Sequence, residues 1–488
     1  MSRTSFGICF ACAATVVLCT PAPAAAQQQA DAGPYGNLFR GSGKPQTQSF
    51  DLSAGLFGGY DDNLLAQGLG NGGTNPFDPR LQVPGVTTGF NSSAQYGYVH
   101  AFRGRSGSQF RFGGGASVQE FTGADKQALW VPNYGAATSF GTNLTSKISF
   151  SASLQGSYAP YYQYVPFMTN GGGGSSAAVS TVVAPADGAT SGNEPTPEVP
   201  IAAINPTPSD VSPVGSDIGF ATQSEFVATG TAAVSITDRL TKRASISIDG
   251  QLTESQVVGQ ARMEGRIAHG TIGYKLTRTI GVHVGYAIQD VHYIQDSAPN
   301  SRLSNHFVDF GIDYGDGHSF SFARYYTVSF STGLSALRNG SDTFFRVDGS
   351  VSLARRMGRT WSASVGAARG TSYILGFADP IYTDSVNAAF GGQIAQRLNL
   401  TTGANYVRGQ NAFSSASGTL ISKMASARLT FGLNQHLGLY GQASYYQYDV
   451  PRDFFTTVDF LQHQNRRSAS VGLTFWMPLI NQRTARQQ

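Results

Sequence analysis

Polar and apolar side chains alternate along most of this chain, and that alternation limits the folds open to it. Phe50, Leu52, Ala54 and Leu56 fall on one face of a first segment, and residues 148–158 repeat the pattern with mostly serine on the second face. Successive side chains of a β-strand point to opposite faces, so each such segment predicts a strand with one apolar and one polar face. About eighteen such segments follow one another, so we expect an all-β fold.

The connections between these segments alternate between short and long. Residues 103–108 and 237–241 are short connections, whereas residues 61–88 and 161–223 are long. Outer-membrane barrels place short turns at the periplasmic rim and long loops outside the cell, whereas a soluble β-sandwich has no reason to sort its connections. We therefore expect an antiparallel transmembrane β-barrel of about 18 strands over residues 49–479, with both termini in the periplasm.

The N-terminal segment predicts export. Residues 1–26 combine Arg3, a short apolar run and Ala24-Ala25-Ala26, which is typical of a cleaved signal peptide. Residues 27–48 are expected to form a flexible periplasmic lead-in, and residues 480–488 a C-terminal tail. All three cysteines lie within the signal, so the exported protein is expected to have neither disulfides nor thiolate chemistry.

Composition and motifs favour a membrane wall over an enzyme. Charged residues make up 13% of the chain, about half of the usual ~25% for soluble domains. A net charge of +4 is too weak to indicate nucleic acid as a partner. The eight histidines are scattered singly, no G-x-S-x-G motif occurs, and Gly41-Ser42-Gly43-Lys44 is followed by Pro45 where a phosphate loop needs Ser or Thr. No catalytic residue, metal site or cofactor is expected.

Charged residues of both signs fall in phase with the small polar residues of the strands. In a barrel this face is the lumen, where such groups set ion preference in a pore or cross-link a filled interior. About eighteen strands leave a lumen too wide for side chains alone to fill, which favours a pore. The pore-lining candidates are Arg111, Asp249, Lys275, Asp309, Asp313, Arg346, Asp348 and Arg428.

Two loop segments carry acidic residues. Residues 161–223 contain Asp187, Glu194, Glu198, Asp210 and Asp217 but no Lys or Arg, and could either constrict the lumen or extend from the surface. Asp61-Asp62-Asn63 offers oxygen ligands for calcium, but the same residues hydrogen-bond their own backbone in turns, and turn chemistry is the reading we favour.

The last strand resembles the C-terminal strand that barrel-assembly machinery recognises in its substrates. In residues 470–477, Ser470 is followed by Gly472 and then by the alternate apolar residues Phe475 and Met477. The machinery is therefore an expected partner, together with outer-membrane lipid.

Short motifs elsewhere are similar to the β-barrel porin families of proteobacterial outer membranes. These motifs are Gly58-Gly59-Tyr60-Asp61-Asp62-Asn63 and the hairpin-like segment at residues 319–331. The resemblance implies an outer-membrane channel for small hydrophilic solutes. A barrel serving envelope polysaccharide export, and a structural or adhesive barrel, stay open as alternatives, as does the oligomeric state.

Overall fold

The computed structural model describes most of the expected barrel region. The described residues are 46–62, 85–99, 108–122, 128–145, 147–160, 226–257, 261–277, 280–295, 301–314, 326–339, 342–357, 360–373, 379–413, 418–434, 436–449, 451 and 463–483.

Every regular element in these ranges is a β-strand. The strands are β1 Gln46–Asp61, β2 Gly85–Val99, β3 Gln109–Thr122, β4 Ala128–Asn143, β5 Ile148–Pro160, β6 Phe226–Asp238, β7 Ala244–Val257, β8 Ala261–Lys275, β9 Ile280–Gln295, β10 Ser301–Tyr314, β11 Tyr326–Asn339, β12 Asp342–Met357, β13 Trp361–Ser372, β14 Ile381–Ala395, β15 Leu398–Asn411, β16 Leu420–Gly432, β17 Leu437–Asp449 and β18 His463–Arg483.

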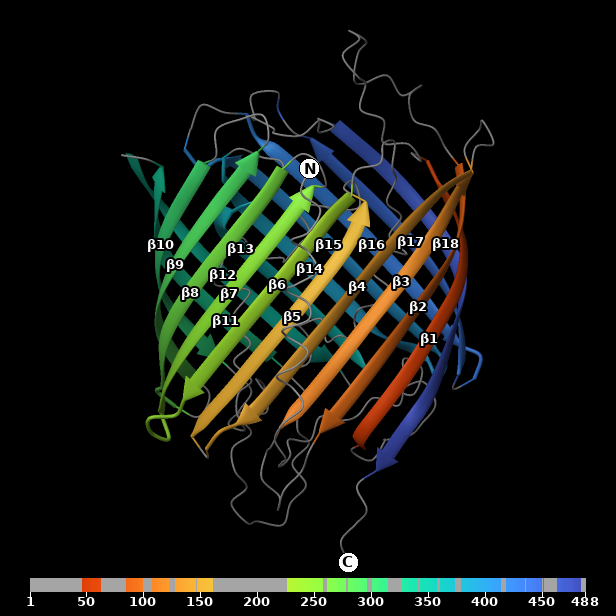
Figure 1. Ribbon diagram of the computed structural model, residues 1–488, viewed down its shortest axis with the longest axis horizontal. Helices are drawn as coiled ribbons and strands as arrows, with labels where there is room; N and C mark the ends of the chain where they lie inside the picture. The colour runs from red at the N-terminus through yellow and green to blue at the C-terminus, as the bar shows by residue number, and fades with distance from the viewer. Residues whose placement is uncertain are drawn as a thin grey trace, which may run out of the picture.

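The strands form one closed sheet (Figure 1). Each strand pairs antiparallel with its neighbours in sequence, and β1 pairs with β18 from Gln46–Arg483 to Asp61–Ser468, which completes an 18-stranded barrel. Closure satisfies the backbone groups that would otherwise be unpaired at two sheet edges. The predicted all-β antiparallel barrel of about 18 strands is confirmed. Among the residues placed by the structure, no helix is long and apolar enough to cross a membrane.

The two faces of the wall differ in chemistry as the alternation predicts. Large apolar side chains point outward along each strand and stay exposed, as with Leu56, Phe90, Phe310 and Phe345. The intervening residues point inward and are mostly small or polar. Inward hydroxyls bond across strands, with oxygen–oxygen distances of 2.6 Å for Ser53–Ser93 and for Ser444–Ser468. An outward apolar band is the surface that a lipid bilayer requires.

Strand ends differ from the sequence expectation. Many strands continue beyond the apolar band, so the connection between β7 and β8 is only residues 258–260, and that between β11 and β12 is only 340–341. At the opposite rim, residues 315–325 join β10 to β11. The strict alternation of short and long connections is therefore wrong at these places. At β7–β8 and β11–β12 the reason is that cross-strand pairing extends into segments with no apolar signal.

The segment boundaries shift for the same reason. Pairing between β1 and β18 carries the barrel from Gln46 to Arg483, beyond the expected 49–479. In the segment at 319–331, residues 326–331 belong to the single strand β11, and the rest lie outside the described residues.

Candidate pore-lining face

The eight candidate charges all fall at inward positions of the register. Asp249 follows the exposed Ile248, Asp309 lies between Val308 and Phe310, and Arg346 lies between Phe345 and Val347, so each points away from the apolar face. The same alternation places Arg111, Lys275, Asp313, Asp348 and Arg428 inward. The side chain of Asp313 lies outside the described residues.

Two of these charges meet two histidines in one cluster. His269 Nδ1 lies 3.5 Å from Asp249 Oδ2, and His269 Nε2 lies 3.6 Å from Asp309 Oδ1. His283 Nε2 lies 3.4 Å from Asp309 Oδ2, so Asp309 contacts both rings. We call Asp249, His269, His283 and Asp309 the inner His–Asp cluster. It spans β7 to β10 on the inner wall.

Glycines make room for the inner His–Asp cluster. Gly285 on β9 separates Asp309 on β10 from His269 on β8, and a Cβ atom at Gly285 would lie 2.8 Å from His269 Nε2 and even closer to the Asp309 carboxylate. Gly311 likewise leaves space for the ring of His283. Without side chains at these two positions, the acidic and imidazole groups can bridge across a strand. The separate histidines give no sign of this in the sequence, because only the register between strands brings them together.

Arg346 reaches from β12 to β14 and to the residue that follows β15. Its Nε and Nη2 donate to the carbonyl oxygen of Ala412 at 3.2 and 2.7 Å, and its guanidinium lies 5.2 Å from the ring centroid of Tyr382. Asp348, two residues along β12, is buried. Along residues 342–348 the β12 strand has no described ladder to β13, and the hydroxyl of Tyr382 donates to the carbonyl of Val347 instead. These contacts hold that part of the wall together.

Arg428 forms a different contact. Its guanidinium stacks over the ring of Tyr440 at 4.2 Å, and Tyr440 itself covers Gly472 on β18. Arg111 contributes its carbonyl to a hydrogen bond from Thr138 at 3.1 Å, and Lys275 is exposed near the end of β8. The seven candidates whose side chains are described therefore form several separate groups around the wall.

Sequence reasoning missed an ion pair at the seam between the first and last strands. Arg466 Nε lies 2.9 Å from Asp61 Oδ2, with 9% and 0% of the two side chains exposed. Next to it, the backbone N–H of Arg467 donates to Asp62 Oδ1 at 2.7 Å. Asp61 and Asp62 therefore fasten β1 to β18, and the turn interpretation of these two residues is wrong. The only available signal was that Asp61 continues the inward phase of β1.

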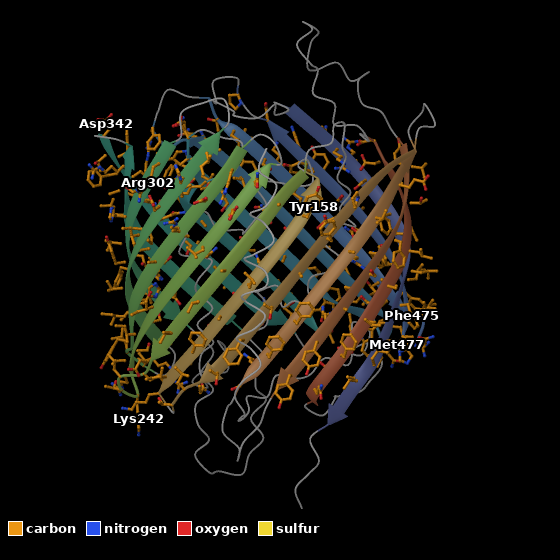
Figure 2. The ribbon with its side chains drawn as sticks, in the orientation of Figure 1. Tyr158, Lys242, Arg302, Asp342, Phe475 and Met477 are labelled. Carbon is orange, nitrogen blue, oxygen red and sulfur yellow. The ribbon has the colours of Figure 1, made fainter. Side chains whose placement is uncertain are left out.

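The assembly-signal residues divide between the two faces of β18. Ser470 and Gly472 point inward and are buried, whereas Phe475 and Met477 point outward (Figure 2). The constriction candidates Asp187, Glu194, Glu198, Asp210 and Asp217 lie outside the described residues. Within the described ranges, no group of three or more His, Cys, Asp and Glu side chains is arranged to hold a metal ion.

Comparison with known proteins finds only distant structural similarity. No protein-family model and no curated protein sequence matches the chain. A BenF-like porin from Pseudomonas fluorescens Pf-5 aligns at 10% identity over 90% of this chain and 100% of that chain, with a TM-score of 0.38. The siderophore receptor PirA from Pseudomonas aeruginosa aligns at 9% identity over 89% and 81%, with a TM-score of 0.39. OccAB4 from Acinetobacter baumannii aligns at 10% identity over 89% and 99%, with a TM-score of 0.35.

Proposed function

We propose that this protein is an integral outer-membrane channel for passive passage of small hydrophilic solutes, with no enzymatic activity. The observation that carries the proposal is the closed 18-stranded wall with an apolar outer face and a polar, charged inner face. Barrels of about 16 to 18 strands enclose an aqueous channel, which is too wide to be filled by the side chains of the wall. Such a wall supports a water-filled pore.

The inward charges are proposed to line the path. Arg111, Lys275, Arg346 and Arg428 offer positive groups, and Asp249, Asp309, Asp313 and Asp348 negative ones, on different parts of the wall. Such rings of fixed charge select ions by sign in pores. The acidic residues of segment 161–223 are proposed to narrow this path, in which case their five carboxylates favour cations.

Orientation and partners complete the proposal. We place both termini in the periplasm because the longest connections, residues 161–225, 63–84 and 450–462, all leave the same rim of the barrel. Outer-membrane lipid surrounds the wall, and the barrel-assembly machinery recognises β18 through Ser470, Gly472, Phe475 and Met477.

Single-channel recording of the refolded mature chain in planar bilayers tests the proposal. We expect stable conductance steps, with Arg428→Gln shifting selectivity toward cations because it removes a positive group from the inner face. Arg408→Gln is the matched control, since Arg408 points outward on β15 and should leave selectivity unchanged.

The same recording addresses the acidic segment. Deleting residues 171–217 should raise conductance and reduce cation preference together if the segment narrows the path. A deletion without effect would remove that role from the five carboxylates. Silence of the correctly folded wild-type chain would contradict the channel and favour an export, assembly or adhesive barrel.

A further inference from the structure

Charged side chains occupy a sector of the outer face on β7 to β10, where lipid must lie. Arg266 on β8 pairs with Asp290 on β9, which pairs with Ser304 on β10, and Arg302 lies next to Ser304 on the same face. These positions are in phase with the outward residues Ile288 and Val308. We call Arg266, Asp290 and Arg302 the outer arginine cluster. The sector continues with Arg262 and Glu264 on β8 and Glu254 on β7.

The guanidinium groups are the accessible part of this cluster. Arg302 grips Asp290 through Nε and Nη2, at 2.9 and 2.8 Å, with the arginine side chain 74% exposed and the aspartate 26%. Arg266 is 67% exposed and lies 3.8 Å from Glu264 Oε2, whereas Arg262 contacts both Glu254 and Glu264 at 3.0 and 2.7 Å. Asp290 and Glu264 are thus 26% and 25% exposed, Glu254 is 42% exposed, and the side chains of Arg266 and Arg302 are the most exposed of the sector.

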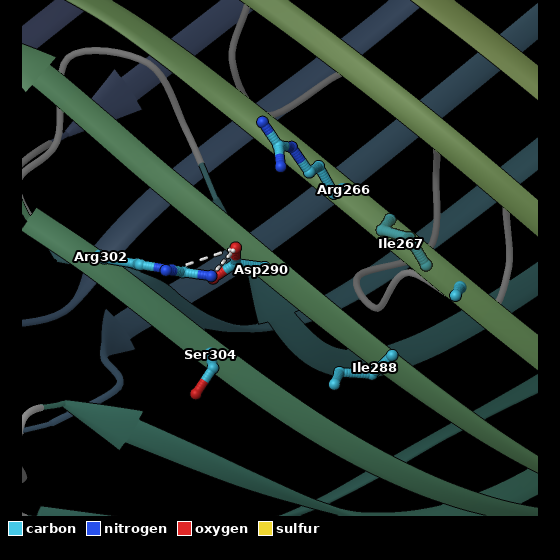
Figure 3. Close-up of a pocket in the computed structure, with 7 residues that line it drawn as sticks. Arg266, Ile267, Ile288, Asp290, Arg302 and Ser304 are labelled. Carbon is cyan, nitrogen blue, oxygen red and sulfur yellow. Dashed lines mark hydrogen bonds and ion pairs between the residues drawn. The ribbon is translucent and has the colours of Figure 1, made fainter.

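A hollow lies between these two arginines (Figure 3). It has a volume of about 350 Å³ and is lined by Arg266, Arg302, Asp290 and Ser304 on its polar side and by Ala268 and Ile288 on its apolar side. Figure 2 places Arg302 toward the same end of the barrel as Tyr158, at the rim opposite Lys242. Away from that rim, the outward residues continue as Tyr286, Val308 and Phe310. Polar groups therefore lie above an apolar wall.

The sector does not cover the whole rim, and a second outward group of charges lies on β13 to β15, where Arg369 contacts Asp384 and Arg408 is next in register. At the corresponding outward ends of β1, β2 and β4 the exposed residues are Tyr60, Val86 and Tyr134. Charge on a lipid-facing surface is costly near the bilayer midplane and nearly neutral in the headgroup region. The outer arginine cluster must therefore lie among headgroups, and it differs from the same rim at β1, β2 and β4.

We propose that the outer arginine cluster binds a phosphorylated glycolipid of the outer leaflet. Arginine pairs with phosphate through charge-assisted hydrogen bonds, so Arg266 and Arg302 would hold the phosphates. Ser304 and Asp290 offer partners to sugar hydroxyls, and the acyl chains lie along Ile288, Tyr286 and Val308. The assignment to the outer leaflet rests on the orientation proposed above, but the binding itself does not require the barrel to conduct.

Native mass spectrometry of the refolded barrel in detergent tests this site. The probes are diphosphoryl lipid A, dephosphorylated lipid A, phosphatidylglycerol and inorganic phosphate. We expect diphosphoryl lipid A to bind, and Arg266→Gln with Arg302→Gln to weaken its binding by about tenfold or more, since each basic group near a membrane surface contributes on the order of 1 kcal/mol. Arg266→Lys with Arg302→Lys should retain most of the affinity.

A control double variant distinguishes lipid binding at this site from a general effect of positive charge on the protein. Arg355→Gln with Arg397→Gln removes two exposed arginines from the opposite rim and should leave lipid A binding unchanged. Arg266→Gln alone keeps the Arg302–Asp290 pair intact and should still lower the affinity, which covers a failure of the double variant to fold.

Equal weakening by both double variants, or equal binding of phosphatidylglycerol and lipid A, would overturn the proposal. Conductance should be the same in all these variants, so a failure of lipid binding is distinguishable from a failure of the channel.

Discussion

A glycine on the inner face of the wall leaves room for a larger side chain on the neighbouring strand. Gly472 faces Tyr440, and a Cβ atom there would lie 2.6 Å from Cε1 of the tyrosine and 2.7 Å from the carbonyl oxygen of Leu56. The ring of Tyr440, buried over Gly472, in turn supports Arg428. Gly472 therefore has a packing role in the barrel, whether or not it is also part of an assembly signal.

Replacing Gly472 by Val should destabilise the folded barrel by about 1 to 3 kcal/mol, because the added carbons meet both a packed ring and backbone. Gly441→Val is the control, since nothing lies within 4 Å of a Cβ atom at Gly441 on the neighbouring strand. Urea unfolding in detergent, followed by tryptophan fluorescence, measures both. Equal destabilisation of the two variants would show that strand glycine, and not the contact with Tyr440, sets the cost.

For single residues, the sequence predicted only which face of the wall each side chain occupies. Alternation alone gave the inward direction of Asp249 and Asp309, because each lies beside an apolar outward residue. Their contacts with His269 depend on the register of β7 with β8, of β8 with β9 and of β9 with β10, and no local pattern specifies these registers. The outer arginine cluster was missed because Arg262, Glu264 and Arg266 continue β8 beyond the apolar residues that reveal a strand.

Strands are the level at which the sequence was most informative. The expected number of about eighteen segments matches the eighteen observed strands, since the apolar band fixes phase and position there. The ends were not predictable, because outside the band both faces are polar and alternation carries no signal. β8 shows this: its uncharged outward residues begin at Ala268, whereas the strand begins at Ala261.

The phase of the last strand can be tested directly. Leu473 points outward and is 45% exposed, whereas Thr474 points inward. Leu473→Arg should cost on the order of 2 to 4 kcal/mol near the bilayer midplane, and Thr474→Arg should cost much less. Folding equilibria in lipid vesicles give both values. A larger loss for Thr474→Arg would mean that the strand is shifted by one residue, which exchanges the two faces.

At the scale of the whole molecule, the two rims carry different connections. Asp342, Arg302 and Tyr158 lie toward one rim and Lys242 toward the other (Figure 2). Residues 161–225 leave the first rim, and the tight turn at 239–243 closes the second. The sequence predicted which connections are long. The side of the membrane on which each connection lies was inferred only from its length.

Cysteine labelling on intact cells tests that orientation. The exported chain is expected to contain no cysteine of its own, and Asp342 and Lys242 are both exposed. Asp342→Cys should react with a membrane-impermeant maleimide because its rim faces outward. Lys242→Cys should react only after the outer membrane is permeabilised. The reverse pattern of labelling would place the termini outside the cell.

Because β1 pairs with β18, the barrel can close only when both ends of the chain are present. A chain exported from its N-terminus presents β1 first and its partner last, so β1 must wait for the whole polypeptide to arrive. A product that stops before residue 463 would expose two unpaired strand edges to lipid, an arrangement that hydrocarbon does not tolerate. The ion pair between Asp61 and Arg466 lies at this seam, so it can form only in a chain that extends to Arg466.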